Sequence, residues 1–327
     1  VRGSDASEYK LDAVIQWPKG KNFKLSSKLS SDYLKLSITK QKEWFDLEGT
    51  LEIGEDSVVE LKTLMALIAK TKGNFVRLDD SQIISLTDEL RNRLHTLEQL
   101  TIDGKFHPLA SPLIDSATQG MRLKTLDGWD RQRNILQQAQ TFKPQLPSTL
   151  QAQLRDYQLD GFDWASRLAF WGGGACLADD MGLGKTIQTL AHLSLEKQQG
   201  RLDQPALIVV PTSLLFNWAR ECKQFAPQLS CQVLHGAGRQ ALFGKQADVY
   251  VTSYALVLRD QAHWQQKPLS YVILDEAQNI KNPRSQVSRA IKSLSPQRRL
   301  CLSGTPLENH LGELWSLFDF AMPGFLG

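Results

Sequence analysis

Hydrophobic and polar residues follow two different patterns in the two parts of this chain. Over residues 34–39 and 45–53 they alternate one by one. The apolar positions of this alternation are Leu34, Leu36, Ile38, Phe45, Leu47, Leu51 and Ile53. A period of two is typical of strands that bury one face, so these stretches predict half-buried antiparallel strands.

Helical spacing replaces the alternation in the next part of the chain. A first apolar stripe, which Gly73 is expected to end, is formed by Val58, Leu61, Leu64, Met65 and Ile68. A second helix, which Thr87 is expected to cap, has a stripe formed by Leu90, Leu94 and Leu97. Together with the strands, these helices predict a small α+β domain over residues 1–142. Its carboxylates lie on polar faces, where solvated charge is the ordinary explanation.

Continuous apolar runs mark the rest of the chain. They cover residues 206–210, 249–251, 271–274 and 300–302, and helix-length segments separate them. Such runs are typical of a mostly parallel sheet with helices on both faces, where ligands bind at the carboxyl ends of the strands. The stretch KPQLPST, with two prolines, predicts a linker over residues 143–149. An α/β domain is therefore expected over residues 150–327.

Composition narrows the picture without naming a function. The chain has 327 residues, 42% hydrophobic and 22% charged, which is enough for two globular domains. Its longest apolar runs fall short of the roughly 20 residues that cross a bilayer, and no signal-peptide pattern opens it, so a cytoplasmic protein without a membrane partner is expected. Four dispersed cysteines indicate buried thiols rather than a zinc site. The net charge of +3 neither requires nor excludes a polyanionic partner.

The stretch LADDMGLGKTIQT, residues 177–189, lies between a short apolar run and a helical pattern. Strand, glycine loop and helix in this order are the context of a phosphate-binding loop. The glycines would let backbone N–H groups converge on phosphates, with Lys185 on the β- and γ-phosphates and Thr186 on Mg²⁺. Because Asp179 stands where the general pattern has glycine, a flexible corner remains the alternative.

The stretch YVILDEAQ places two carboxylates at the end of an apolar strand. Mg²⁺ prefers hard oxygen ligands, so Asp275 is the candidate metal ligand, and Glu276 is the candidate general base for an attacking water. An Asp-Glu pair in this position is also a common turn or helix-cap signal. Its occurrence together with the glycine loop favours a nucleotide site.

Six segments in series resemble the first RecA-like lobe of Swi/Snf-family ATPases. They are LRDYQLDGFDWASRL, LADDMGLGKTIQT, LIVVPTSLLFNWARE, VYVTSYALV, LDEAQNIKNPRSQVSRAIKSL and LSGTPLENHLGELWSLFDF. The resemblance begins near Leu150, and an acidic residue at the position of Asp179 is usual in this family. The preceding α+β region resembles the helicase-associated segment of some bacterial members.

The resemblance implies roles for individual residues. Gln158 would read the adenine edge, although it could be an ordinary surface glutamine. The nucleotide cradle would consist of Asp180, Met181, Gly182, Leu183, Gly184, Lys185 and Thr186. Nucleotide state would be coupled to the nucleic-acid track by Gln278, Ser303, Gly304 and Thr305. Nucleic-acid backbone contacts would come from Pro211, Thr212, Ser213, Thr252, Ser253, Tyr254, Lys281 and Arg284, several of which could instead be helix caps.

Charge supplies one further observation. Between residues 280 and 300 there are six basic residues and no acidic one: Lys281, Arg284, Arg289, Lys292, Arg298 and Arg299. A stripe that tracks phosphates and a solvated helix face are both open readings of this segment. Trp218 and Trp315 are expected to pack in the core.

The resemblance implies an ATP- and Mg²⁺-dependent hydrolase that translocates on double-stranded DNA and remodels protein–DNA complexes without separating strands. The alternatives are a related motor that recycles RNA polymerase, or a nucleotide-switched module whose N-terminal α+β region recruits a protein. Beside double-stranded DNA, the expected partner is RNA polymerase or another DNA-bound protein. The location would be the cytoplasm, on the nucleoid in a bacterium. Family members continue into a second lobe that carries arginine fingers, so this chain by itself is expected to bind Mg-ATP but to turn it over at less than roughly 1 per second.

Overall fold

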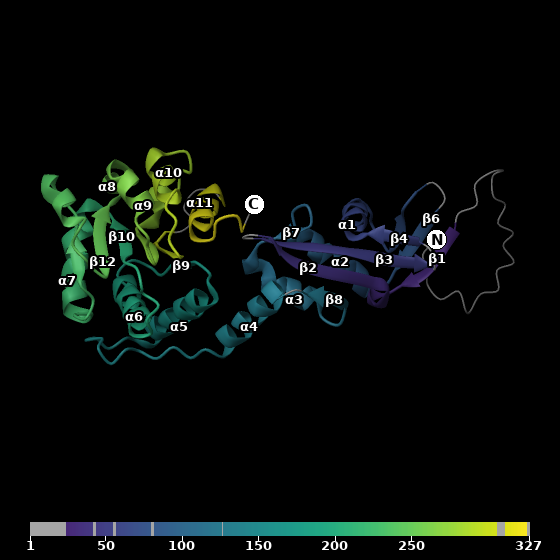
Figure 1. Cartoon of the computed structure of the whole chain (residues 1–327), viewed down its shortest axis with the longest axis horizontal. Coiled ribbons are helices and arrows are strands. Elements are labelled where there is room, and N and C mark those ends of the chain that lie inside the picture. The colour runs from purple at the N-terminus through teal and green to yellow at the C-terminus, as the bar shows by residue number, and fades with distance from the viewer. Residues whose placement is uncertain are drawn as a thin grey trace. The chain divides into compact units, whose positions relative to one another are not determined.

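The computed structural model describes residues 24–41, 44–54, 57–79, 82–125, 127–305 and 311–325. Among them, the residues up to Trp129 form one compact unit and those from Asp130 onward form another. Figure 1 shows the first unit in purple and blue and the second in teal, green and yellow. Residues 142–147, which follow helix α4, contain neither helix nor strand.

Among the described residues, the first unit contains two sheets, and three α-helices and the start of a fourth accompany them. One sheet has the order β4 (Ser57–Glu60), β3 (Trp44–Gly54), β2 (Leu34–Gln41), β8 (Arg122–Thr125), with β7 (Lys105–Phe106) also paired to β3. The other has the order β1 (Lys24–Leu29), β6 (Gln82–Leu86), β5 (Phe75–Arg77). The helices are α1 (Leu61–Lys70), α2 (Asp88–Leu100), α3 (Ser111–Thr118) and α4 (Asp127–Thr141), the last of which runs on into the second unit.

The alternating pattern correctly predicted β2 and β3 of this unit. β2 and β3 are antiparallel, and Leu34, Leu36 and Ile38 are buried while the residues between them are half-buried or exposed. The second predicted helix is also confirmed, since the Thr87 hydroxyl oxygen accepts from the N–H of Leu90 at 3.2 Å.

The bounds of the first helix differ from the expectation. Val58 lies in β4, where it pairs with Glu52 of β3, so the hydrogen bonds of the sheet override the helical spacing that links it to Leu61. At the other end, α1 stops at Lys70 with Thr71 as its C-cap. Gly73 has the left-handed φ of 103° expected after a helix, but it lies three residues beyond the last helical one.

The second unit is an α/β domain built on six strands. All strand pairs in this sheet are parallel, in the order β11 (Cys231–Val233), β12 (Val249–Ser253), β10 (Ala206–Val210), β13 (Tyr271–Asp275), β14 (Arg298–Leu302), β9 (Ala175–Leu177). The four apolar runs are therefore confirmed as strands. Because all six are parallel, their carboxyl ends meet at one edge of the sheet.

Helices cover both faces of this sheet, as predicted. Along β10, Ala206, Ile208 and Val210 face one core and Leu207 and Val209 face the other. The first core is shared with α5 (Asp156–Trp171), α6 (Lys185–Gln198) and α7 (Leu215–Phe225). The second is shared with α8 (Tyr254–Arg259), α9 (Gln261–Gln266), α10 (Gln286–Lys292) and α11 (Leu311–Ala321), and the helices can be followed in Figure 1.

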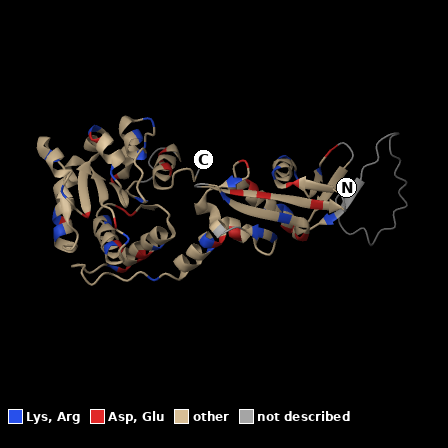
Figure 2. Cartoon of the chain, in the orientation of Figure 1, with Lys and Arg blue, Asp and Glu red and all other residues tan. Residues whose placement is uncertain are grey.

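Charge is spread over both units rather than gathered in one part. Figure 2 shows lysine and arginine interspersed with aspartate and glutamate along each unit. Within the described ranges, no helix is long and apolar enough to cross a membrane. The distribution of charge therefore does not mark either unit as the one that binds a charged partner.

Candidate functional site

The glycine loop between β9 and α6 has the geometry of an anion-binding turn. Gly182 and Gly184 have φ angles of 83° and 81°, in the left-handed region that favours glycine. Helix α6 begins at Lys185 with Gly184 as its N-cap, and glycine has no side chain to occupy the first N–H groups of the helix. Those N–H groups, with the positive end of the helix dipole, are a suitable place for a phosphate.

The Lys185 side chain folds back over this loop. It is only 9% exposed, and its ammonium group donates to the carbonyl oxygens of Asp179 at 2.7 Å and Asp180 at 3.0 Å. Gln188, one turn further along α6, donates from Nε2 to the Asp179 carboxylate at 3.0 Å. These contacts hold a lysine cation and its loop together at the place where the sequence predicts phosphates.

Asp275 and Glu276 follow at the carboxyl end of β13. Asp275 is 7% exposed, and burial raises the pKa of its carboxyl group above the ordinary value, while hydrogen bonding from the Trp218 indole opposes that rise. Glu276 has a φ of 52°, an uncommon left-handed conformation for a residue with a side chain. Such backbone strain costs on the order of 1 kcal/mol and tends to occur at functional sites.

One pocket of about 500 Å³ brings these two motifs together. The predicted site residues in its lining are Met181, Gly182, Gly184, Lys185, Thr186, Asp275 and Glu276. The Thr186 hydroxyl and the Asp275 carboxylate are hard oxygen donors, which fit the requirements of Mg²⁺. The pocket therefore combines a loop suited to phosphates, two oxygen donors suited to Mg²⁺, and the second carboxylate of Glu276.

Helix α7 supplies a wall of this pocket that the sequence analysis missed. Its contributions are Asn217, Trp218, Arg220, Glu221, Gln224 and Phe225, preceded by Leu214. Trp218 is 1% exposed and packs in the core as expected, whereas Trp315, for which the same was expected, is 37% exposed. The Trp218 indole N–H also donates to Asp275 Oδ2 at 2.8 Å. The apolar spacing of the segment marks the buried position, and nothing in it signals a partner 57 residues away in sequence.

Gln158 supports the loop in this structure. It is 9% exposed near the start of α5, where its Oε1 accepts from the N–H of Arg155 at 2.9 Å. Its Nε2 donates to the carbonyl oxygen of Leu183 at 3.0 Å. It is therefore no ordinary surface glutamine, and its reading of adenine stays a prediction.

The predicted coupling residues form a connected path next to the pocket. Gln278 Nε2 donates to the Glu276 carboxylate at 2.6 Å, and the Ser303 hydroxyl donates to Gln278 Oε1 at 3.0 Å. Ser303 Oγ in turn accepts from the N–H of Thr305 at 3.2 Å. Gly304 lies so close to Met181 of the glycine loop that a Cβ at this position would come within 2.8 Å of the Met181 Cγ.

The residues predicted to touch a nucleic-acid backbone separate into two groups. Thr212 and Ser213 are exposed, and Pro211 is half-buried, between β10 and α7. Thr252 and Ser253 are the last two residues of β12, Tyr254 begins α8, and all three are buried. Ser253 still lines a pocket of about 430 Å³ together with Thr212.

Tyr254 faces the core, and its contact with nucleic acid stays a prediction. Its side chain is 7% exposed, and its hydroxyl donates to the carbonyl oxygen of Asp275 at 2.7 Å. A hydroxyl used in this way braces the candidate metal ligand from behind and is not presented to a duplex. The Thr252 hydroxyl likewise points inward, to the Leu234 carbonyl oxygen at 3.3 Å.

The six basic residues between 280 and 300 do not form one uniform surface. Lys292 pairs with Asp319 at 2.7 Å, Arg298 donates to the Ala169 carbonyl oxygen at 2.6 Å, and Arg299 donates to that of Phe320 at 3.1 Å. Lys281 lies 3.6 Å from the Glu313 carboxylate, whereas Arg284 is exposed. Arg298 and Arg299 of β14 thus hold helices onto the sheet, and Lys292 joins α10 to α11, so neither a continuous phosphate stripe nor a fully solvated face describes the segment.

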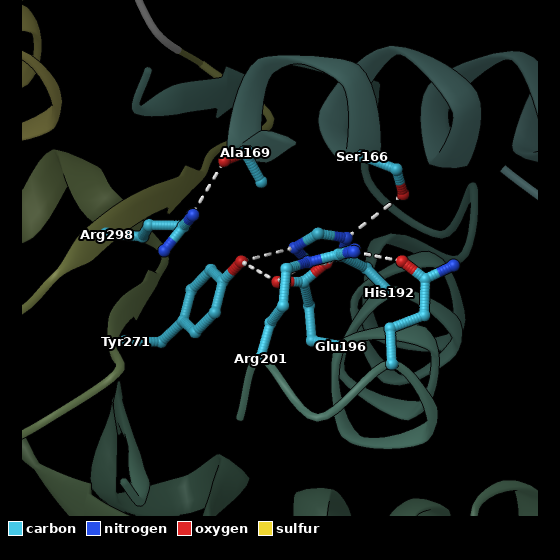
Figure 3. A network of polar contacts seen from close by, with 8 residues as sticks. Ser166, Ala169, His192, Glu196, Arg201, Tyr271 and Arg298 are labelled. Atoms are coloured by element: carbon cyan, nitrogen blue, oxygen red, sulfur yellow. Dashed lines mark hydrogen bonds and ion pairs between the residues drawn. The ribbon is translucent and has the colours of Figure 1, made fainter. Parts of the chain in front are cut away.

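A buried polar network joins the helices and strands that carry the motifs. Figure 3 shows the Tyr271 hydroxyl between the His192 ring and the Glu196 carboxylate, at 3.0 and 3.1 Å. Because Tyr271 donates to Glu196, its oxygen accepts from His192 Nε2–H, and His192 Nδ1 accepts from the Ser166 hydroxyl at 3.0 Å. Arg201 completes the network as the cation paired with Glu196. The network ties α5, α6 and the start of β13 together.

Comparisons with known proteins match the region that carries the motifs, and one relative matches nearly the whole chain. Residues 157–327 match the family described as SNF2-related domain. The Bacillus subtilis (strain 168) protein that bears the name ATP-dependent helicase/translocase YwqA is 34% identical over 362 residues, which include 99% of this chain and 38% of that protein. Helicase SWR1 of Saccharomyces cerevisiae is 45% identical over 188 residues, which include 54% of this chain and 12% of that protein.

A solved structure agrees with the sequence matches. The Sulfolobus solfataricus SWI2/SNF2 ATPase core in complex with dsDNA has a TM-score of 0.53 and 42% identity to this chain. The match covers 56% of this chain and 38% of that one. This chain therefore spans well under half the length of each of these relatives.

Proposed function

This chain belongs to the family of SNF2-related domains, and from that membership we propose that its second unit binds Mg-ATP and hydrolyses it as part of a motor on double-stranded DNA. The observation that carries the proposal is the convergence of Lys185, Thr186, Asp275 and Glu276 on one pocket of about 500 Å³. The family match and the Bacillus relative directly support a helicase-like ATPase domain of this family.

Each of the four residues has a role that follows from its position. Lys185 and the first N–H groups of α6 would bind the β- and γ-phosphates. Thr186 and Asp275 would hold Mg²⁺, which supplies charge neutralisation between the phosphates. Glu276 would accept a proton from the attacking water, since its carboxylate lines the same pocket and is oriented by Gln278.

The choice of double-stranded DNA rests on two observations. The Sulfolobus relative, which is 42% identical, is an ATPase core in complex with dsDNA. In this chain the exposed hydroxyls of Thr212 and Ser213 lie just before α7, which lines the nucleotide pocket. Hydroxyl groups at such a position can hold a phosphodiester without reading base sequence. Remodelling of protein–DNA complexes without strand separation is the use we propose for this motor.

The test is steady-state ATP turnover by the native full-length protein with no nucleic acid, duplex DNA, single-stranded DNA or RNA. Lys185→Ala is the blank, and Lys70→Ala, an exposed lysine of the first unit, is the matched control. Strong stimulation by duplex DNA that Lys185→Ala abolishes and Lys70→Ala retains is the expected result. Turnover that no nucleic acid changes would contradict the DNA motor and favour a protein client.

A further inference from the structure

The Trp218 indole is aimed at the candidate metal ligand from inside the core. Its Nε1–H donates to Asp275 Oδ2 at 2.8 Å, while Oδ1 of the same carboxylate accepts from the N–H of Glu276 at 3.0 Å. Both carboxylate oxygens therefore have a fixed donor, one from α7 and one from the backbone. A carboxylate held at both oxygens keeps one orientation towards the pocket.

The donor itself is rigidly held. Leu215, Trp218 and Cys222 form a buried stripe on α7, and their exposed fractions are 0%, 1% and 1%. All three pack in the core between the sheet and the helices on the face that α6 covers. The indole cannot turn away from Asp275 without breaking this packing, so α7 acts as a fixed support for the carboxylate.

A hydrogen bond from a buried indole is not routine in this chain. Within the part of the chain that the structure describes, Trp264 is also buried, at 2% exposure, yet its Nε1 has no hydrogen-bond partner. Trp264 packs in the core on the other face of the same sheet. The two side chains have the same size and burial and differ in whether the N–H has a target.

The hydrogen bond from Trp218 stabilises the Asp275 carboxylate. Burial disfavours a carboxylate, and each donor restores part of the lost solvation. Groups that hydrogen-bond a metal ligand orient it, and their removal typically weakens metal affinity by about 10- to 100-fold. The N–H of Trp218 is in the position to do this for Asp275.

We propose that Trp218 is a positioning residue, which fixes the Asp275 carboxylate in the orientation that binds Mg²⁺ with the nucleotide. The inference rests on the proposed function, because it assumes that Asp275 is a metal ligand. Trp218 would act on the site through Asp275. It belongs to α7, which lies outside the glycine loop and outside the segment that carries Asp275 and Glu276. The first effect of removing the N–H would be on Mg²⁺-dependent binding of nucleotide, and turnover would follow from that.

The experiment compares Trp218→Phe with Trp264→Phe in this chain. Each variant keeps an aromatic ring in the core and removes one indole N–H, and only that of Trp218 has a partner. Binding of a fluorescent ATP analogue is measured across a Mg²⁺ titration and in excess chelator, and the Tm of each variant is recorded. We expect Trp218→Phe to raise about tenfold the Mg²⁺ concentration at which analogue binding is half-maximal. The affinity for the analogue in excess chelator should stay within about twofold of wild type. Trp264→Phe is expected to leave both values unchanged.

A second substitution separates the hydrogen bond from packing. Benzothienylalanine at position 218 has the bicyclic shape of tryptophan with sulfur in place of N–H, and it should reproduce the tenfold shift even where Trp218→Phe lowers the Tm. An unchanged Mg²⁺ requirement in this variant, or an equal shift in Trp264→Phe, would overturn the positioning role. A wild-type chain that binds the analogue equally well with and without Mg²⁺ would overturn the proposed function, and this role with it.

Discussion

The hydroxyl of Ser303 donates to Oε1 of Gln278 at 3.0 Å and so joins the ends of two neighbouring strands, β14 and β13. Gln278 passes the contact on, because its Nε2 donates to the Glu276 carboxylate at 2.6 Å. A movement of the segment after β14 would therefore reach the candidate general base through two hydrogen bonds. Neither Ser303 nor Gln278 lines the nucleotide pocket.

Ser303→Ala is expected to lower duplex-stimulated turnover of the native protein about tenfold, within the usual range of coupling between sites. Nucleotide affinity should stay within about twofold of wild type, since the pocket lining is unchanged. Gln278→Ala should have the same effect, and the double variant should be no worse than either single one. Turnover losses that multiply in the double variant would show that the two residues act separately.

Gly184→Ala is expected to weaken nucleotide binding by this chain at least about tenfold, on the scale of a misplaced positioning group. A Cβ at this left-handed position would come within 2.4 Å of Gln158 Nε2 and would displace the glutamine that supports the loop. Gly200→Ala, at the other end of α6, is the control, since its φ is 69° but a Cβ there meets nothing within 4 Å. Wild-type nucleotide affinity in Gly184→Ala would count against the described loop geometry.

Tyr254→Phe is expected to destabilise the fold by about 1 kcal/mol, the usual contribution of one hydrogen bond. Affinity for duplex DNA should be unchanged, because the hydroxyl is bonded to the Asp275 carbonyl oxygen. Thr212→Ala, which removes an exposed hydroxyl, should lower duplex affinity instead. Denaturant unfolding and fluorescence anisotropy measure the two effects. Weaker duplex binding by Tyr254→Phe would support the contact with the nucleic-acid backbone that the sequence predicted for Tyr254.

The stability of this chain should fall as the pH falls from 6.5 towards 4 because of His192. Burial lowers the pKa of His192 from its ordinary 6.5 to about 4, with Arg201 and Arg298 acting in the same direction and Glu196 opposing them. Between these values the unfolded chain binds a proton that the folded His192 does not, so the free energy of unfolding rises with pH.

A His192→Gln variant should lose about 1.6 kcal/mol less than wild type between pH 6.5 and 5. The pKa of Glu196 is held below its ordinary 4.5, so its titration lies at lower pH, and the shift at His263 is common to both proteins. Equal slopes of unfolding free energy against pH in the two proteins would show that His192 titrates as an exposed histidine does.

The sequence was sufficient for features that depend on local patterns. The apolar runs predicted buried parallel strands, and the glycines with Lys185 predicted the loop between β9 and α6, because spacing along the chain determines both. The resemblance to Swi/Snf ATPases is confirmed by the match over residues 157–327. The RecA-like fold it implied agrees with the parallel sheet and with the Sulfolobus ATPase core.

Other features depend on which side chains meet across the fold, and spacing does not encode that. Val58 was expected in a helix but lies in β4, because β4 pairs with β3. Trp218 and Tyr254 belong to motif segments, yet both turn inward to Asp275, one to its carboxylate and one to its carbonyl oxygen. A hydroxyl or indole in a motif looks the same in sequence whether it faces solvent or the core.

Calorimetric titration of Mg-ATP into this chain tests the central claim most directly. The account predicts binding at one site, lost in Lys185→Ala, weakened in Asp275→Asn only when Mg²⁺ is present, and retained in Lys70→Ala. Binding that survives Lys185→Ala unchanged, or the absence of any binding by a folded wild-type chain, would show that the pocket between the glycine loop and β13 is not a nucleotide site.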